Sequence, residues 1–247
     1  MGKLIILSGP SCIGKSPLDK ALGKFYPDLH NKLNHLVLYN SRDPRPGEKE
    51  GVDYYFRTHA QVLSLKNSQQ YAVMEVRGYM QALDVKKLKQ QLNHENVFFF
   101  FFSFIIRMLQ THENLQGIDR LSVFMSPVSR EEVAYFTDPS NNQNFNQIIT
   151  DIMRRKLLIR TRKQKGELSL KDLENIEKRA GSAFYELHEA YYFDYVIPNH
   201  DGEDSEHWDA FYHPIGDARK ALIQFAQLLD GKIPEGIETW DKSIFEY

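Results

Sequence analysis

Short continuous apolar runs alternate along the chain with longer stretches whose apolar residues recur at helical spacing. Continuous apolar runs are typical of strands buried on both faces of a parallel sheet. The pattern predicts such strands at residues 4–7, 35–39, 97–102, 121–125 and 195–197. It predicts helices at residues 17–25, 85–92, 104–112, 130–136, 147–162, 170–191 and 217–229. Strands separated by helices favour an α/β fold with a five-stranded parallel sheet and helices on both faces.

Two regions interrupt this alternation. Residues 41–83 contain the short strand-like pieces DYYF and YAVMEV around a predicted helix at residues 59–66, which indicates a small insert. Residues 137–146 are polar and rich in turn-forming residues, so we expect a mobile loop there. A basic run from Arg154 to Lys165 follows, and taken alone it is typical of a solvated helix face.

Composition excludes several functional classes. The most apolar segment, VFFFFFSFII at residues 97–106, is too short for a membrane span, which needs about 20 residues, so we expect a buried strand. A net charge of −2 provides no general attraction to nucleic acid or to a membrane surface, and neither is expected as a partner. The single cysteine excludes an internal disulfide framework. Together with an N-terminus that lacks a signal-peptide pattern, it predicts a cytoplasmic protein.

The segment GPSCIGKS at residues 9–16 fits the spacing G-x-x-x-x-G-K-[ST] of a phosphate-binding loop. Glycines at the two fixed positions let the backbone curl so that successive N–H groups point at a polyanion, and the following helix adds the positive end of its dipole. Lys15 would then reach the β- and γ-phosphates, and the Ser16 hydroxyl would be a ligand of Mg²⁺. The motif predicts a nucleotide phosphate site formed by Gly9, Ser11, Cys12, Ile13, Gly14, Lys15 and Ser16.

Cys12 lies inside this loop. It is interpreted as a small residue that fills the loop. The alternative is a reactive thiol, because backbone N–H groups and a helix N-terminus lower the pKa of a thiol.

The segment YNSRDPRPGEKEGVDYYF at residues 39–56 places two arginines on either side of a proline that stiffens the turn. The planar guanidinium of Arg42 or Arg45 suits a phosphate monoester, because it binds two oxygens at once. Tyr54 follows closely. The histidines and carboxylates of residues 199–213 lack the spacing of a metal site, so this segment is interpreted as a solvated acidic loop.

With GPSCIGKS and SRDPRPGEKEGVDYYF in this order, the sequence resembles the guanylate kinases. The resemblance is dense over residues 4–75 and thinner from residue 154 to residue 199. It implies that Arg42, Arg45 and Tyr54 hold the phosphate of a nucleoside monophosphate. It also implies that the segments KLLIR, ending at Arg160, and IEKR, ending at Arg179, form a lid whose basic residues close over the ATP phosphates. The segment VIPN, ending at Asn199, resembles the loop of that family near the adenine.

The sequence departs from the family pattern on the acceptor side. Strand carboxylates that serve Mg²⁺ and the acceptor in the family correspond to about Phe100 and Phe102, and a phosphate-binding serine corresponds to Leu38. The family's guanine-binding glutamate falls at Ala72, and Glu75, three residues on, is the remaining candidate for that role. A segment of G-N-Y-Y-G-T type has become GYMQALD.

The resemblance implies a guanylate-kinase-like domain over residues 1–230 and a C-terminal tail at 231–247. Within the domain we expect a core (1–40, 84–136 and 166–230), an acceptor-binding insert (41–83), and a loop with a lid (137–165). The implied function is transfer of a phosphoryl group from ATP, with Mg²⁺, to a nucleoside monophosphate, with GMP as the acceptor in the family. The missing carboxylates leave two alternatives open: a kinase with a different acceptor, and a nucleotide- or partner-binding module that has lost catalysis.

Overall fold

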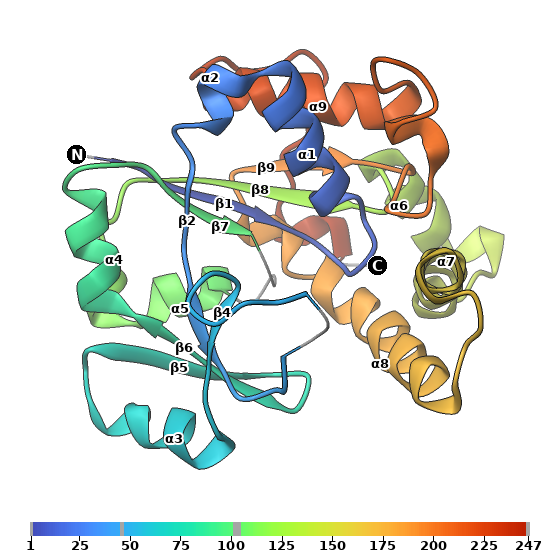
Figure 1. Cartoon of the computed structure of the whole chain (residues 1–247). Helices are drawn as coiled ribbons and strands as arrows, with labels where there is room; N and C mark the ends of the chain where they lie inside the picture. The colour runs from blue at the N-terminus through green and yellow to red at the C-terminus, as the bar shows by residue number, and fades with distance from the viewer. Residues whose placement is uncertain (1, 45–46, 101–104, 246–247) are drawn as a thin grey trace. The chain divides into compact units, whose positions relative to one another are not determined.

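The computed structural model describes residues 2–44, 47–100 and 105–245 (Figure 1). A five-stranded sheet has the order β2-β7-β1-β8-β9. Its strands are β1 (Leu4–Ser8), β2 (Asn34–His35), β7 (Val97–Phe100), β8 (Arg120–Ser126) and β9 (Tyr195–Pro198). The pairs β2–β7 and β8–β9 are parallel. The predicted α/β fold with a five-stranded parallel sheet is confirmed.

The chain divides into two compact units. The first holds the N-terminal residues up to Ile6 together with Leu33–Phe100 and Ile105–Leu121, and the second holds Leu7–Lys32 and the residues from Ser122 onward. A second, four-stranded sheet lies in the first unit, in the order β4-β3-β6-β5. Its strands are β3 (Leu38–Asn40), β4 (Tyr54–Phe56), β5 (Tyr71–Val76) and β6 (Tyr79–Asp84).

Helices connect and cover these strands. The α-helices are α1 (Lys15–Phe25), α2 (Pro27–His30), α3 (His59–Ser64), α4 (Val85–Leu92), α5 (Ile105–Thr111), α6 (Arg130–Thr137), α7 (Phe145–Lys165), α8 (Leu170–Leu187) and α9 (Gly216–Leu229). The 3₁₀ helices are η1 (Leu65–Asn67), η2 (Glu113–Leu115), η3 (Pro139–Asn141), η4 (Ala190–Tyr192), η5 (Glu206–Trp208) and η6 (Lys242–Phe245). Within the second unit α7 and α8 pack as an antiparallel hairpin, because Phe145 contacts Phe184 at one end and Lys165 pairs with Asp172 at the other; Figure 1 shows α7 end-on.

The hairpin is held by apolar stripes at helical spacing. On α7 the buried residues are Phe145, Ile149, Met153, Leu157 and Thr161, one at every fourth position, so a single face of the helix is covered. On α8 the buried face includes Ile176, Ala180, Ala183 and Leu187. An ion pair between Arg154 and Glu177, with atoms 2.7 Å apart, adds a polar link between the two helices.

Two predicted elements differ from the structure. The apolar run at residues 35–39 is not one strand: β2 ends at His35 and β3 begins at Leu38, so the chain passes there from one sheet to the other. The segment predicted as a mobile loop at residues 137–146 holds η3 and the N-cap of α7, where the Asn144 side chain accepts a hydrogen bond from the Gln147 N–H.

The phenylalanine-rich segment forms a strand where the structure describes it. Val97, Phe98 and Phe99 in β7 are buried, as predicted, whereas residues 101–104 lie outside the described part. None of the helices described has the length and hydropathy of a membrane span. Residues 231–245 pack in the second unit, where the Val196 N–H and the Glu238 carbonyl lie 2.8 Å apart.

Candidate active site

The loop between β1 and α1 has the backbone conformation that its glycines allow. Gly9 and Gly14 have φ angles of 138° and 104°, which disfavour residues with a Cβ. A Cβ on Gly9 would lie 2.3 Å from the Met125 carbonyl oxygen, and one on Gly14 would lie 2.6 Å from Asn199 Nδ2. Both glycines are therefore required for the loop to pack in this conformation.

Lys15 is the first residue of α1, and its ammonium group lies against the loop. Lys15 Nζ donates hydrogen bonds to the carbonyl oxygens of Gly9 and Pro10, over 2.7 and 2.8 Å. The residue is buried, whereas Ser16 beside it is exposed in the first turn of the helix. A cation, an exposed hydroxyl and the positive end of a helix dipole thus gather at one end of α1, an arrangement that favours an anion.

Cys12 is a buried loop residue. Its φ is 70°, its exposure is 1%, and its Sγ donates to the Lys156 carbonyl oxygen at 3.4 Å. Burial is the main cause that raises the pKa of the thiol to about 12, and the nearby carboxylate of Glu203 acts in the same direction. The burial of Cys12 contradicts the alternative of a reactive thiol, because reagents cannot reach the side chain and desolvation disfavours the thiolate.

We expect alkylation of Cys12 to be slow without any nucleotide. Raising the thiol pKa from 9.0 to about 12 lowers the thiolate fraction at pH 8 by about 10³-fold. Iodoacetamide should therefore modify the native chain at least ~10³-fold more slowly than the urea-unfolded chain, as measured by intact mass. MgATP should change this slow rate little. Rapid labelling of the native chain would contradict the burial of the thiol.

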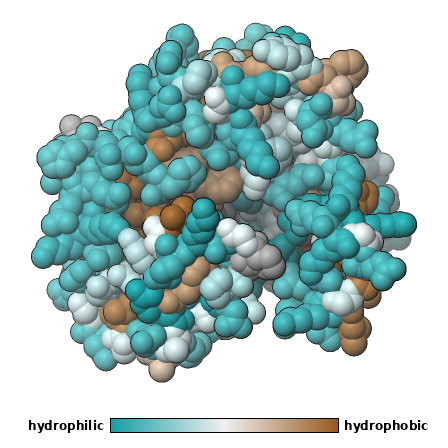
Figure 2. All heavy atoms as spheres, in the orientation of Figure 1, coloured by the Kyte–Doolittle hydropathy of each residue, from teal (hydrophilic) through white to brown (hydrophobic). Residues whose placement is uncertain are grey.

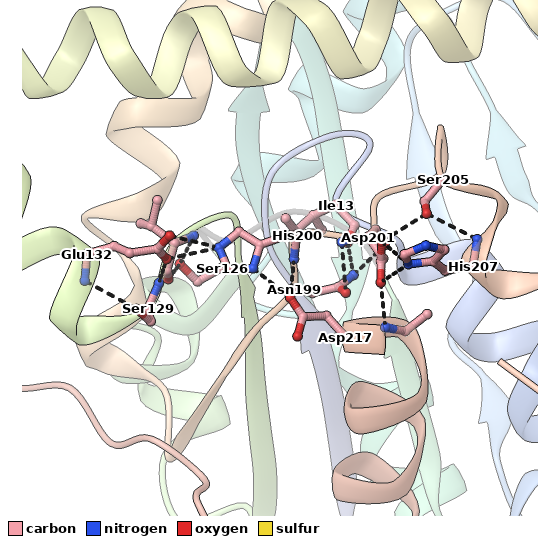
Figure 3. Close-up of polar contacts among 12 residues, drawn as sticks. Ile13, Ser126, Ser129, Glu132, Asn199, His200, Asp201, Ser205, His207 and Asp217 are labelled. Carbon is pink, nitrogen blue, oxygen red and sulfur yellow. Dashed lines mark hydrogen bonds and ion pairs between the residues drawn. The ribbon is translucent and has the colours of Figure 1, made fainter. Parts of the chain in front are cut away.

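Asn199 fixes the back of the phosphate loop (Figure 3). It is fully buried after β9, and its Nδ2 donates to the carbonyl oxygens of Ile13 and Asp201, both at 2.7 Å. The Trp208 indole N–H donates to the Asp201 carbonyl at 2.8 Å, and the Glu203 N–H donates to the Cys12 carbonyl at 3.2 Å. The prediction that residues 199–213 form a solvated loop is therefore wrong for its first part, which is hydrogen-bonded to Cys12 and Ile13 of the phosphate loop.

Basic residues of α7 lie beside the same loop and are paired with acidic residues that follow β9. Arg160 donates to Glu203 over 2.9 Å, and Lys156 lies 3.6 Å from an Asp204 carboxylate oxygen. All four side chains are near enough to Cys12 to influence its pKa. Figure 2 shows a mostly hydrophilic surface around α7, on the right of the view. Arg179 lies on α8 and is partly buried.

His200 joins two helices near this loop (Figure 3). Its Nε2 lies 2.9 Å from a Glu132 carboxylate oxygen on α6, and its Nδ1 lies 2.5 Å from Asp217 on α9. Burial lowers the pKa of the imidazole, but hydrogen bonds to the two carboxylates outweigh this, and the pKa is raised above its usual value.

We expect this cluster to make stability depend on pH. Because the folded-state pKa is raised, the contribution of His200 is fully present below its unfolded pKa, about 6.5, and is lost as the pH rises through the folded value. The melting temperature should therefore fall more at pH 5.5 than at pH 8.5 on His200→Gln. The effect should be small, because the side chain is half exposed. Exposed His94, replaced by Gln, is the control, and a pH-independent effect of His200→Gln would contradict the assignment.

The predicted acceptor residues lie in the first unit. Arg42 donates two hydrogen bonds to the Glu48 carboxylate, at 2.7 and 2.5 Å. Its guanidinium carbon lies 5.1 Å from the centre of the Tyr54 ring and 5.7 Å from that of Phe56. The structure thus brings Arg42 and Tyr54 together, with the arginine held in a fixed orientation. Arg45 lies outside the described residues.

Glu75 is not placed on the same face as Arg42 and Tyr54. On β5 the residues Ala72 and Glu75 are three apart, so their side chains point to opposite faces of the four-stranded sheet. Glu75 is exposed and Ala72 is buried, as is Leu38. Of the two phenylalanines at the predicted acidic positions, Phe100 is the last residue of β7, and Phe102 lies outside the described residues.

Sequence reasoning did not single out four polar residues that the structure places beside the candidate site residues. Glu203 and Asp204 sit in a run of mixed polar residues and were not distinguished from a solvated loop. Asn40 and Gln81, described below, also carry no motif. Neither residue lies on a strand that the sequence predicts, so no pattern in the sequence distinguished them.

Comparison with known proteins identifies the family. The guanylate kinase family model matches residues 1–153. A guanylate kinase of Synechococcus sp. (strain JA-3-3Ab) is 45% identical over 64 residues, which cover 26% of this chain and 28% of that protein. A guanylate kinase of Ehrlichia canis (strain Jake) is 28% identical over 214 residues, 83% of either chain.

The fold agrees with this match. The crystal structure of guanylate kinase from Anaplasma phagocytophilum superimposes with a TM-score of 0.50 at 18% identity, and the alignment covers 93% of this chain and 85% of that one. The family model spans more than half of the chain and includes both the phosphate loop and the acceptor segment. The chain therefore belongs to the guanylate kinase family.

Proposed function

We propose that the chain transfers the γ-phosphoryl group of ATP to GMP, forming ADP and GDP. The observation that carries this proposal is the loop of residues 9–16, in which the buried ammonium of Lys15 lies against the loop at the N-terminus of α1. Phosphoryl transfer is mostly positioning and charge neutralisation, so it needs clustered cations more than a nucleophilic side chain. Membership of the family and relatives named guanylate kinase support the same reaction.

On the donor side, the loop N–H groups and Lys15 would bind the ATP phosphates, and Arg160 and Arg179 would neutralise the transferring group. Arg160 lies close to the loop residue Cys12, which supports its part in this role. Asn199 is buried and bonded to the Ile13 carbonyl, so we assign it to holding the loop in shape on the nucleotide side.

On the acceptor side, Arg42 would bind two oxygens of the GMP phosphate. The ring of Tyr54, over which the guanidinium lies, would hold it in position. The paired hydrogen bonds of Arg42 to Glu48 support this, because a carboxylate presents two oxygens with a geometry similar to that of a phosphate. Arg45 is proposed as a second phosphate ligand on the resemblance alone, and Glu75 keeps no described contact that supports a role at the base.

The residues at the loop also fit Mg²⁺. Mg²⁺ usually keeps several waters and takes one or two protein ligands together with substrate phosphates, so the exposed Ser16 hydroxyl at the start of α1 is a sufficient protein ligand. A bound Mg²⁺ supplies charge neutralisation between the phosphates. For the compartment we propose the cytoplasm, which the single, free and buried cysteine supports.

The proposal is tested by a coupled ADP-release assay with MgATP and each of GMP, IMP, AMP and CMP, with calorimetric titration of the same nucleotides alongside. Turnover with GMP is the expected result. Binding of MgATP without turnover on any monophosphate would contradict the proposal and favour the binding-module alternative, which the phenylalanine at position 100 also favours.

A further inference from the structure

Two buried carboxamides lie side by side in the four-stranded sheet, and each has one polar atom that lacks a hydrogen-bond partner among the described residues. Asn40 on β3 is 1% exposed and Gln81 on β6 is 8% exposed, and the two are directly opposite each other in the antiparallel register. Asn40 Nδ2 and Gln81 Oε1 have no partner within the described part of the chain. The Asn40 Oδ1 accepts from the Arg42 N–H at 3.1 Å, which fixes the orientation of this amide and leaves its NH₂ group as the unpaired one.

Both side chains lie on the face of the sheet that carries Arg42. The other face is covered by α3, whose Val62 packs against Met80 and Ala82. Because neighbouring strand residues alternate between faces, Asn40 and Gln81 point away from α3. In the register of β3 with β4, Asn40 is opposite Phe56, so the rings of Tyr54 and Phe56 lie on the same face as Asn40 and Gln81. The Arg42 guanidinium lies over those two rings.

An unpaired donor beside an unpaired acceptor can bind a ligand group that presents one acceptor and one donor. Groups that are shielded from bulk water and unpaired destabilise the fold, so each calls for a partner such as a water, an ion or a ligand. One NH₂ donor and one carbonyl acceptor together match a base edge that presents one acceptor and one donor in adjacent positions. A 6-oxopurine has such an edge, with its O6 accepting and its N1–H donating.

We propose that Asn40 and Gln81 recognise the O6/N1–H edge of the acceptor base, so that the chain accepts 6-oxopurine nucleoside monophosphates as a class. This inference rests on the proposed function and deepens it. The pair offers nothing to the 2-amino group that distinguishes guanine from hypoxanthine, and Ala72 and Leu83, which flank the pair on the same face, are apolar. GMP and IMP should therefore be used with similar efficiency, and AMP, whose edge has the opposite polarity, should be a poor acceptor.

The test compares the parent with Asn40→Leu and Gln81→Met, which replace each carboxamide with an apolar side chain of similar shape. We expect kcat/KM for GMP and for IMP to agree within ~10-fold in the parent, and each variant to raise the KM of both acceptors at least ~10-fold. The KM of ATP should not change. The melting temperature should stay level or rise, because the variant removes a buried unpaired group. Exposed Gln90 on α4, replaced by Met, is the matched control.

Three results would overturn the inference. These are variants that keep the parent KM for GMP and IMP, a parent that prefers GMP over IMP by more than ~10³-fold, and equal use of AMP and GMP. A parent that turns over no monophosphate would instead contradict the proposed function. In that case, calorimetric binding of GMP and IMP to the parent and the two variants still decides the role of the pair: equal affinities in all three proteins would overturn it.

Discussion

Replacing Lys15 by methionine is expected to lower kcat/KM for phosphoryl transfer at least ~100-fold, because a preorganised anion site loses its cation. The same change removes two hydrogen bonds to the loop carbonyls of Gly9 and Pro10, so the free energy of unfolding should fall by about 1–3 kcal/mol. Steady-state kinetics and chemical denaturation at one temperature measure the two effects.

The matched control for Lys15 is Lys20→Met, at an exposed position of the same helix. It removes the same charge and leaves the loop intact, so its activity should stay within twofold of the parent, roughly the range of a neutral surface change. If Lys15→Met bound MgATP as tightly as the parent, the loop would not be the phosphate site.

Arg42→Lys is expected to raise the acceptor KM by about 10–100-fold, the fold-change that corresponds to loss of one charge-assisted hydrogen bond. Lysine keeps the charge but cannot bind two oxygens of one phosphate, and it cannot lie flat over the rings of Tyr54 and Phe56. Because the proposed contact is with the phosphate that all these acceptors share, the KM of every accepted monophosphate should rise by the same factor.

Arg57→Lys is the control for this change, since Arg57 is also paired with a glutamate, Glu50 at 2.8 Å, but is far more exposed. It should leave every KM unchanged. A loss of affinity for one base only on Arg42→Lys would show that Arg42 recognises the base and not the phosphate.

Much of the fold could be predicted from the sequence, because local chemistry determines it. The apolar runs of β1, β8 and β9 allow little besides buried strands, and the buried stripe of α7 recurs at every fourth residue. The passage between β2 and β3 could not be predicted. A continuous apolar run shows that a segment is buried, but it does not show which of two sheets a strand joins.

Of the candidate site, the part that local sequence determines could be predicted, and the part that depends on contacts distant in sequence could not. The phosphate loop was predictable because glycine spacing encodes its backbone, with φ angles of 138° and 104° at Gly9 and Gly14. The burial of Cys12 depends on Lys156, which is distant in sequence, and no local pattern contains that contact. The position of Asn40 opposite Gln81 likewise depends on the register of β3 and β6, which are separated in the chain by β4, α3, η1 and β5.

If α7 contributes to the proposed triphosphate site, its ion pairs with Glu203 and Asp204 make binding an exchange of anions. Lys156 and Arg160 already face carboxylates that are only 15–18% exposed, so an incoming phosphate competes with an internal ligand. The observed dissociation constant equals the intrinsic one divided by the fraction of molecules in which these carboxylates have moved away. Since the displaced anion belongs to the chain and is not a dissolved counterion, MgATP affinity depends less on ionic strength than the charge of α7 alone would suggest.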